Sequence, residues 1–302
     1  MSSTLNRRTF SKALGAATLS GLGATPARRL QIGHTCITWG TFPRGSEASA
    51  TLEAALQDIA SLGFHSFETF PENLEDWDVK GALQKLIDTH GVPLKSGYIR
   101  TNLTDPAARK ENLAQVIRLA KVIKKYGGTF GVLAPNSVKR EGYDFRAHRA
   151  NIIATLNESA LAVNDVGLGT GLHQHTGTCI ETREEVYAVM ESANTNHLKF
   201  APDVGQLQKG GADAAKVVKD FLSLVRHMHL KDYSGGEHFV GYCPLGQGKV
   251  DIPAILDMVE GTNQPANIMV ELDPSPNQPI TPRETARISK AYLEKLGYTF
   301  RA

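Results

Sequence analysis

Apolar, strand-like runs alternate with amphipathic helical patterns eight times between residue 30 and the end of this 302-residue chain. The repeated order of strand and helix is typical of parallel βαβ units. No long linker or break in composition interrupts the series. Eight such units in about 275 residues predict a single (β/α)8 TIM barrel over residues 28–302. An open doubly wound sheet is the alternative arrangement of the same units.

The expected elements follow from these patterns. The strands are predicted at 31–39, 65–70, 94–99, 130–135, 168–175, 198–203, 225–231 and 267–272. The helices are predicted at about 50–62, 79–90, 107–126, 146–165, 182–192, 212–223, 252–260 and 283–296. Boundary signals support several of them: Thr182 followed by Glu185 forms a capping box, and Asp105-Pro106 begins a helix.

The first 27 residues contain Arg7, Arg8 and Lys12 and no acidic residue, and a short stretch rich in Gly and Ala follows the basic group. The paired arginines, with Phe10 two positions further on, resemble a twin-arginine export signal. We therefore expect residues 1–27 to be a removable signal and the remaining chain to be periplasmic. A disordered or amphipathic tail is the alternative interpretation.

The charge outside this segment argues against a nucleic-acid partner. Without its three basic residues the chain has 30 basic residues left of 33, against 31 acidic ones, which is a net charge of −1. No basic surface for nucleic acid is therefore expected. No apolar run is long enough to span a bilayer, so no membrane partner is expected after signal removal. Three cysteines do not make a disulfide framework. A homo-oligomer is compatible with this composition.

Metal-binding side chains end three consecutive predicted strands: Asp203, His229 and Glu271. Barrel enzymes build their active sites at the carboxyl ends of the strands, so these three groups are expected to meet. Two carboxylates at such a short distance from each other need a cation or a shared proton. Mixed oxygen and nitrogen ligands suit Mn²⁺, Co²⁺, Mg²⁺ or Zn²⁺. Each residue alone is more often a solvated acid or a hydrogen-bonded core histidine.

Several segments resemble known proteins. Residues 173–182, HQHTGTCIET, are similar to the HxHxGTxxET segment of inosose-dehydratase-like proteins. Three shorter segments resemble the wider xylose isomerase-like family of sugar isomerases and epimerases: 203–206 (DVGQ), 227–232 (HMHLKD) and 245–248 (LGQG). The resemblance covers nearly the whole chain beyond the signal and is most specific from 168 to 273. It implies a TIM barrel that binds one divalent cation, with Mn²⁺ the first choice, through Glu, Asp, His and Glu.

The resemblance assigns the last three ligands to Asp203, His229 and Glu271. The first ligand has two candidates in this chain. Glu181 preserves the charge of the family site, whereas His173 occupies the strand register in which relatives carry glutamate. We expect Glu181 to be the ligand and keep His173 as the alternative ligand or as a substrate contact.

Four further side chains are expected to bind substrate. Many relatives have histidine three residues after the metal aspartate, but this chain has Gln206, which cannot carry a proton near neutral pH. Glu68 ends the second predicted strand and is expected to contact sugar hydroxyls. Trp39 and Tyr98 offer the flat apolar surface that a sugar ring packs against, although each aromatic alone is more often part of a core.

The expected chemistry is proton abstraction next to a carbonyl, through an enediolate that the metal stabilises. Glu271 is expected to act as ligand and base, and His175 as an acid or base. Lys231 is expected to neutralise an oxyanion, or else to pair with Asp232. No phosphate-binding loop is evident, since Lys209 and the glycines after it lack the P-loop spacing.

These residues predict a metal-dependent isomerase or epimerase of an unphosphorylated keto sugar. A lyase or dehydratase that eliminates a β-substituent from a 3-keto-glycoside or inosose is the second interpretation. A non-catalytic periplasmic sugar-binding protein is the third. A metal nuclease needs more ligands and a basic groove, which the near-neutral chain does not provide.

Overall fold

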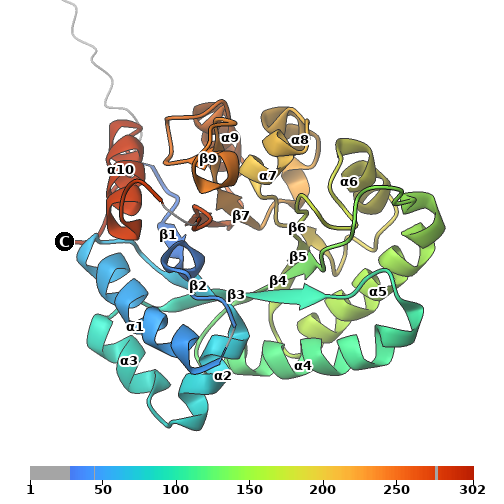
Figure 1. Ribbon diagram of the computed structural model, residues 1–302, viewed down its shortest axis with the longest axis horizontal. Coiled ribbons are helices and arrows are strands. Elements are labelled where there is room, and N and C mark those ends of the chain that lie inside the picture. The colour runs from blue at the N-terminus through green and yellow to red at the C-terminus, as the bar shows by residue number, and fades with distance from the viewer. Residues whose placement is uncertain (1–27, 44, 276–277) are drawn as a thin grey trace, which may run out of the picture.

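A computed structural model describes residues 28–43, 45–275 and 278–302, which form a ring of parallel strands surrounded by helices (Figure 1). The predicted signal at 1–27 lies outside the described residues. The strands of the ring are β1 (Ile32–Thr35), β2 (Phe67–Thr69), β3 (Leu94–Thr101), β4 (Phe130–Pro135), β5 (Gly169–Leu172), β6 (Lys199–Phe200), β7 (His227–Leu230) and β10 (Asn267–Val270). A small antiparallel pair, β8 (Asp232–Tyr233) and β9 (Tyr242–Cys243), follows β7.

The strand order confirms the predicted barrel. The sheet runs β6-β5-β4-β3-β2-β1-β10-β7, so the first strand pairs with the last, with His34 opposite Val270. Single parallel bridges join Phe200 to Val225 and Asp203 to His229, and they link β6 to β7. The eight parallel strands therefore form a nearly closed barrel rather than an open doubly wound sheet.

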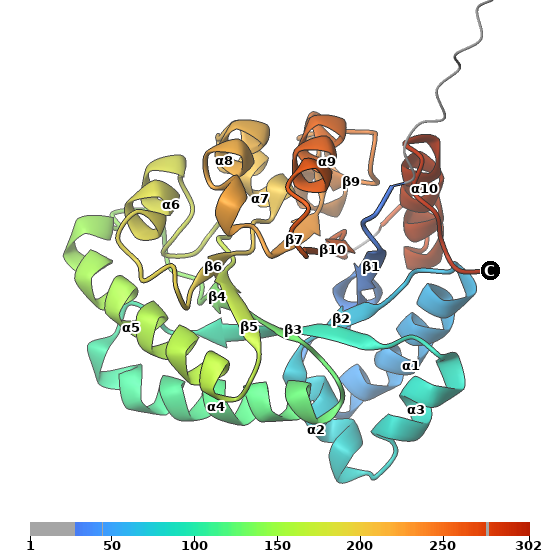
Figure 2. The same ribbon diagram turned by 180° about the vertical axis from the view of Figure 1, so that it is seen from behind.

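Helices cover the outside of the ring, as the view from behind also shows (Figure 2). They are α1 (Gly45–Ser61), α2 (Pro71–Val79), α3 (Leu83–His90), α4 (Arg109–Lys125), α5 (Phe145–Asp165), α6 (Arg183–Met190), α7 (Val204–Lys209), α8 (Ala214–Asp220), α9 (Ile252–Gly261) and α10 (Pro282–Lys295). Within the described part of the chain, none of these helices has both the length and the apolar character needed to cross a membrane.

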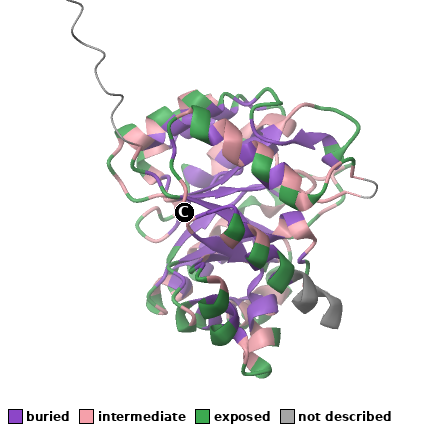
Figure 3. Cartoon of the chain, turned by 90° about the vertical axis from the view of Figure 1, so that its left-hand side faces the viewer, coloured by how far each residue is buried: buried purple, intermediate pink, exposed green. Residues whose placement is uncertain are grey.

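Buried residues follow the strands and the inner faces of the helices, whereas exposed residues gather on the outer helix faces (Figure 3). The buried residues include a large apolar core. Helix α4 illustrates the pattern: Val116, Leu119, Ala120 and Ile123 recur at helical spacing and are all buried. This spacing places them on one stripe that faces the sheet. The barrel therefore holds its strand ends on a rigid, well-packed support.

The element boundaries differ from the predicted ones at two short helices. Helices α2 and α7 directly follow β2 and β6, and neither was expected. The predicted helix at 79–90 is shorter, because Gly81 takes a positive φ of 65° and separates α2 from α3. The predicted capping box is confirmed: Thr182 accepts from the Glu185 amide, and the Glu185 carboxylate accepts from the Thr182 amide at the start of α6.

Candidate functional site

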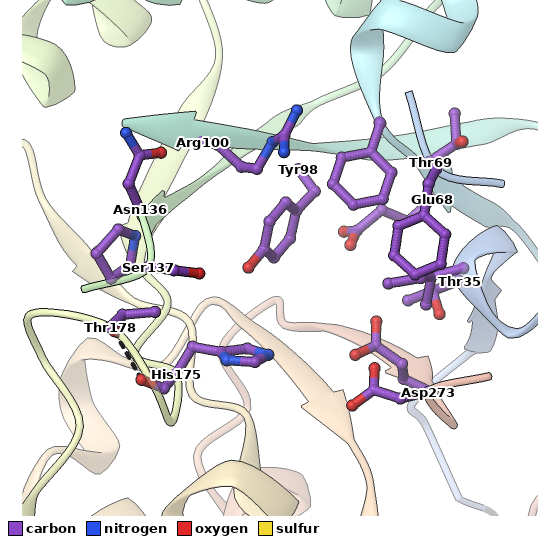
Figure 4. Close-up of a pocket in the computed structure, with 15 residues that line it drawn as sticks. Thr35, Glu68, Thr69, Tyr98, Arg100, Asn136, Ser137, His175, Thr178 and Asp273 are labelled. Carbon is purple, nitrogen blue, oxygen red and sulfur yellow. Dashed lines mark hydrogen bonds between the residues drawn. The ribbon is translucent and has the colours of Figure 1, made fainter. Parts of the chain in front are cut away.

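A pocket of about 450 Å³ opens at the carboxyl ends of the strands. The residues that line it come from the ends of β1 to β5 and of β10 or from the loops that follow them: Thr35, Ile37, Phe42, Glu68, Thr69, Phe70, Tyr98, Arg100, Pro135, Asn136, Ser137, His175, Thr178, Glu271 and Asp273. Figure 4 shows that the Tyr98 hydroxyl and the His175 ring both point into this space. The pocket lies where a barrel of this type carries its active site.

Three buried metal-ligating side chains meet beside the pocket. His173, Asp203 and His229 each offer one ligand atom, and these atoms lie within 4.8 Å of one another. His173 follows β5, Asp203 is the N-cap of α7, and His229 lies in β7. Glu271 follows β10, and its Oε2 atom lies 3.1 Å from Nδ1 of His229.

The hydrogen bonds of this cluster leave one atom of each group free. Nδ1 of His173 is 3.1 Å from the Ala201 carbonyl, which therefore accepts its proton and leaves Nε2 unprotonated. Asp203 uses Oδ1 to accept from the Gln206 amide, which caps α7. Nε2 of His229 lies 2.6 Å from a carboxylate oxygen of Glu68.

Three buried atoms of the cluster make no hydrogen bond among the described residues: His173 Nε2, Asp203 Oδ2 and His229 Nδ1. Two of them have a charged neighbour instead, since Asp203 Oδ2 lies 2.9 Å from Lys231 Nζ and His229 Nδ1 lies 3.1 Å from Glu271 Oε2. Buried polar atoms without partners are rare in proteins, so this convergence needs a cause. Two imidazole nitrogens beside carboxylate oxygens form a donor set that suits a divalent cation. The cluster therefore fits a bound metal ion.

Lys231 is fully buried next to the same cluster. Its Nζ atom lies 2.9 Å from Asp203, 2.6 Å from Glu271 and 3.1 Å from Asp273. Burial lowers the pKa of Lys231, but the carboxylates of Asp203, Asp273 and Glu271 outweigh burial and raise that pKa well above its ordinary value. The side chain is therefore an ammonium, fixed between three acids.

Glu271 is held in its charged form as well, whereas burial raises the pKa of Asp203. Burial raises the pKa of Glu271, but His229 and Lys231 outweigh it and hold the pKa well below its usual range. Burial lowers the pKa of His229, and the carboxylates of Glu271 and Glu68 raise it well above its ordinary value. The cluster thus draws positive charge strongly to itself.

His175 is held by a separate set of hydrogen bonds. Its Nδ1 atom is 2.8 Å from the Thr176 carbonyl, and its Nε2 atom is 2.7 Å from the side-chain nitrogen of Gln206. The Gln206 oxygen accepts from the amide and the hydroxyl of Thr176. This orientation of the amide makes Gln206 a donor to His175, so Nδ1 carries the proton of the neutral ring.

Residues 56–296 match the family described as Xylose isomerase-like TIM barrel. The chain belongs to this family. Inosose dehydratase of Clostridium botulinum (strain Alaska E43 / Type E3) is 22% identical over 271 residues, 81% of this chain and 89% of that protein.

Solved structures share the fold of this xylose isomerase-like chain. The IolI protein with a bound zinc atom is 15% identical, with a TM-score of 0.71 over 89% of this chain and 98% of that one. The 3-keto-D-glucoside 4-epimerase YcjR from E. coli is 16% identical, with a TM-score of 0.67 over 88% of this chain and 100% of that one. At such identities the likeness concerns the fold alone.

In this xylose isomerase-like barrel, Glu181 lies apart from the ligand cluster. Its carboxylate accepts from the Gly177 amide at 2.5 Å and lies 3.6 Å from Arg140. Among the described residues, Glu181 joins no group of three or more side chains that can hold a metal ion. His173 takes the place beside Asp203 that we expected Glu181 to take.

The residues expected to bind substrate occupy different places. Tyr98 lines the pocket, and its ring lies 6.1 Å from that of His229. Trp39 does not line it, since its ring nitrogen donates to Asp58 and its side chain packs against the core. Gln206 is 1% exposed and contacts His175 and Thr176 rather than the pocket.

The structure adds residues to the site that the sequence did not single out. Asp273, Arg100, Asn136 and Ser137 line the pocket. His227 lies next to Glu68 below His229 in the strand. The spacing of two residues between His227 and His229 is the signal that was available, because it puts both rings on the same face of β7.

Proposed function

We propose that this protein is a metal-dependent carbohydrate enzyme that removes a proton next to the carbonyl of a keto sugar. Return of the proton to another carbon, or to the other face of the same carbon, makes it an isomerase or epimerase. One observation carries the proposal: buried ligand atoms of His173, Asp203 and His229 that make no hydrogen bond among the described residues converge beside a pocket at the strand ends. The family match and the relatives named above support it.

The proposed ligands are His173, Asp203, His229 and Glu271. His173 replaces Glu181 in this set because its Nε2 atom is buried and unpartnered, whereas the Glu181 carboxylate is hydrogen-bonded elsewhere. A divalent ion held there polarises the carbonyl oxygen of a substrate and makes the neighbouring C–H bond more acidic. We propose Mn²⁺, with Co²⁺, Mg²⁺ and Zn²⁺ as ions that the same donor set accepts.

We propose that residues between the ligand cluster and the pocket carry out the proton transfer. Glu271 contacts the cluster and also lines the pocket, which suits it to take the proton from carbon. His175 also lines the pocket and carries its ring into it (Figure 4), so we propose it as the second acid or base. The ammonium of Lys231 neutralises negative charge that develops on a substrate oxygen.

The lining of the pocket supports an uncharged sugar as substrate. Tyr98 and Phe70 provide ring surfaces, and Asn136 and Ser137 provide hydrogen-bonding groups. Arg100 also lines the pocket, but it lies 3.9 Å from Glu72, which balances its charge. We therefore propose an unphosphorylated keto sugar, inosose or oxidised glycoside.

We also propose that residues 1–27 are a twin-arginine signal and that the barrel at 28–302 works in the periplasm. The support is the sequence alone: the paired arginines and the weakly apolar segment after them. Replacing Arg7 and Arg8 by Lys is expected to keep the protein in the cytoplasm. Unchanged periplasmic recovery of that variant would contradict this part of the proposal.

Elimination is the second candidate function. Removal of the same proton followed by loss of a β-hydroxyl or β-glycoside gives a dehydratase or lyase. The similarity to inosose dehydratases over 81% of the chain favours this outcome. Both reactions begin with the same proton transfer, so the same site serves either one.

The test uses the protein loaded with Mn²⁺ and a 3-keto-glucoside as substrate. A new epimer or isomer in the proton NMR spectrum is the expected result, and an enone absorbing in the ultraviolet identifies the eliminating enzyme instead. The Asp203→Ala variant, expected to lack the metal, is the control. A protein that retains metal and binds the sugar without changing it would be a sugar-binding protein, and the proposal would fail.

A further inference from the structure

Glu68 is a buried carboxylate with a partner on each of its oxygens. It is the middle residue of β2 and is 1% exposed. Its Oε1 atom lies 2.6 Å from Nε2 of His229, and its Oε2 atom accepts from the Ser96 hydroxyl at 2.5 Å. Oε2 also lies 3.1 Å from Nε2 of His227. Both carboxylate oxygens of Glu68 thus contact neighbours on β3 and β7, while the side chain also lines the pocket.

The contact with His229 determines which ring nitrogen of that residue is available. A carboxylate only accepts hydrogen bonds, so the proton between Glu68 and His229 belongs to Nε2. A histidine binds a metal only through an unprotonated nitrogen, which in this ring is Nδ1. Nδ1 makes no hydrogen bond among the described residues, lies 3.1 Å from Glu271 and shares a group with Asp203 and His173.

We propose that Glu68 is a positioning residue that fixes the tautomer and the orientation of His229 for metal binding. Carboxylates that accept from the second nitrogen of a ligating histidine raise its basicity and hold its ring in place. This inference rests on the metal centre of the proposed function. It gives Glu68 a role beside the expected contact with substrate hydroxyls, which stays a prediction because Glu68 also lines the pocket.

The surroundings of His227 distinguish a positioning role of Glu68 from a role of Glu68 as a metal ligand. Its ring stacks on Phe130 at 5.1 Å and is fully buried. Glu68, His227 and His229 also form a group that can hold a metal ion, and His229 is common to both groups. A second metal ion there would need Nε2 of His229, which lies 2.6 Å from Glu68 in a hydrogen bond. The geometry therefore favours one ion per chain, with Glu68 behind its ligand.

The experiment compares Co²⁺ binding by the full-length wild type, Glu68→Gln and Glu185→Gln. Glu185 is the matched control because it is a buried glutamate in the capping box of α6. Each protein is stripped with a chelator and titrated with Co²⁺ while its visible absorption is followed. Metal per chain is then measured by elemental analysis.

We expect one Co²⁺ per chain in the wild type and in Glu185→Gln, with equal affinity. Glu68→Gln should bind one Co²⁺ about 10- to 100-fold more weakly. Its cobalt absorption bands should also shift, because the ligand field depends on how His229 is held. Ser96→Ala keeps the carboxylate and should weaken binding in the same direction by a smaller factor, so it serves if Glu68→Gln does not fold.

Two results would overturn the role of Glu68. Equal affinity and equal spectra in Glu68→Gln or Ser96→Ala and the wild type would show that Glu68 does not position the ligand. Two Co²⁺ ions per wild-type chain, falling to one in Glu68→Gln, would make Glu68 a ligand itself. A wild type that binds no Co²⁺ would instead remove the proposed metal centre, and the role of Glu68 with it.

Discussion

Single residues in this site are defined by the atom that their hydrogen bonds leave free. Nδ1 of His173 donates to the Ala201 carbonyl, and Oδ1 of Asp203 accepts from the Gln206 amide. His175 differs, since its Nε2 atom accepts from Gln206 and its Nδ1 atom donates to a backbone carbonyl. Any proton that reaches Nε2 of His175 must displace the hydrogen bond from Gln206.

The proposed role of His175 gives the first prediction. His175→Ala should lower turnover of the keto sugar by a factor of about 10² to 10⁴, the usual contribution of a general acid or base. Bound metal should stay at the wild-type level, because His175 is not among the proposed ligands. Steady-state kinetics and elemental analysis measure the two quantities.

The control for that prediction is His65→Ala. His65 precedes β2 at the opposite end of the barrel, where its ring contacts the Thr299 carbonyl. Turnover should be unchanged in this variant. Wild-type turnover in His175→Ala would show that the ring takes no part in proton transfer.

A pH-dependent prediction concerns His34, which is 1% exposed and packs against Trp39 and Phe64. Burial lowers the pKa of His34 to about 4. The unfolded chain, with an ordinary pKa near 6.5, therefore binds more protons than the folded chain between these values. Folding stability that depends on neutral His34 is present above about pH 6.5 and is lost as the pH falls towards 4.

His34→Phe should remove this dependence. Between pH 7 and pH 5 the wild type should lose about 2 kcal/mol more unfolding free energy than the variant does. Urea unfolding of the metal-free proteins at both pH values measures the difference. Equal losses of unfolding free energy in the two proteins would show that unfolding does not change the protonation of His34.

The sequence predicted the positions of only some of the site's residues. The strand ends alone indicated that Asp203, His229 and Glu271 meet. The sequence favoured Glu181 over His173, because it did not reveal the turn with Gly177 at a φ of 76° that precedes Glu181. The contacts of Glu68 and Trp39 depend on neighbours distant in the chain, so their places could not be read from local pattern.

Elements after the strand ends hold the site in shape. Asp232 follows β7 and accepts hydrogen bonds from four backbone amides, those of Tyr233, Gly246, Gly248 and Val250. A Cβ atom at Gly248 would collide with the Asp232 carboxylate, which explains the glycine there. One buried carboxylate thus fastens the loop at 244–250 to the segment after β7 that contains Lys231.

Asp232→Ala should release this loop. Each hydrogen bond to a charged group contributes about 1.5–3 kcal/mol, so we expect a loss of at least about 3 kcal/mol in unfolding free energy. Hydrogen exchange at the amides of Gly246, Gly248 and Val250 should become faster. Exchange rates equal to those of the wild type at these amides would contradict the role of Asp232.

Element prediction succeeded for the long helices and missed two short ones, α2 and α7. Helices such as α4 and α5 carry several turns of apolar periodicity, and their predicted positions match closely. Helix α7 has six residues, which is less than two turns and too short to show a period. Its start depends on Asp203, which we interpreted only as a metal ligand.

The whole molecule is a barrel whose interior charges converge at one end. The first and last strands pair, and β6 and β7 meet only through isolated bridges. The alternation of strands and helices was enough to predict this architecture, because few other folds accommodate eight successive βαβ units. One of the isolated bridges between β6 and β7 joins Asp203 to His229.

Metal binding should therefore stabilise the fold as a whole. At a metal concentration 100 times the Kd, a single site in the folded state adds about 2.7 kcal/mol to the unfolding free energy. Urea unfolding with and without Mn²⁺ should show this gain in the wild type and not in His229→Ala. The same gain in both proteins would place the metal somewhere other than the proposed centre.

The most direct test of the proposed function is hydrogen exchange at carbon. The Mn²⁺-loaded protein is incubated with a 3-keto-glucoside in deuterated water, and deuterium next to the carbonyl is followed by NMR and mass spectrometry. We predict incorporation at this position with the wild type and none above background with Asp203→Ala. Bound sugar and bound metal without any incorporation would contradict proton abstraction as the function of this site.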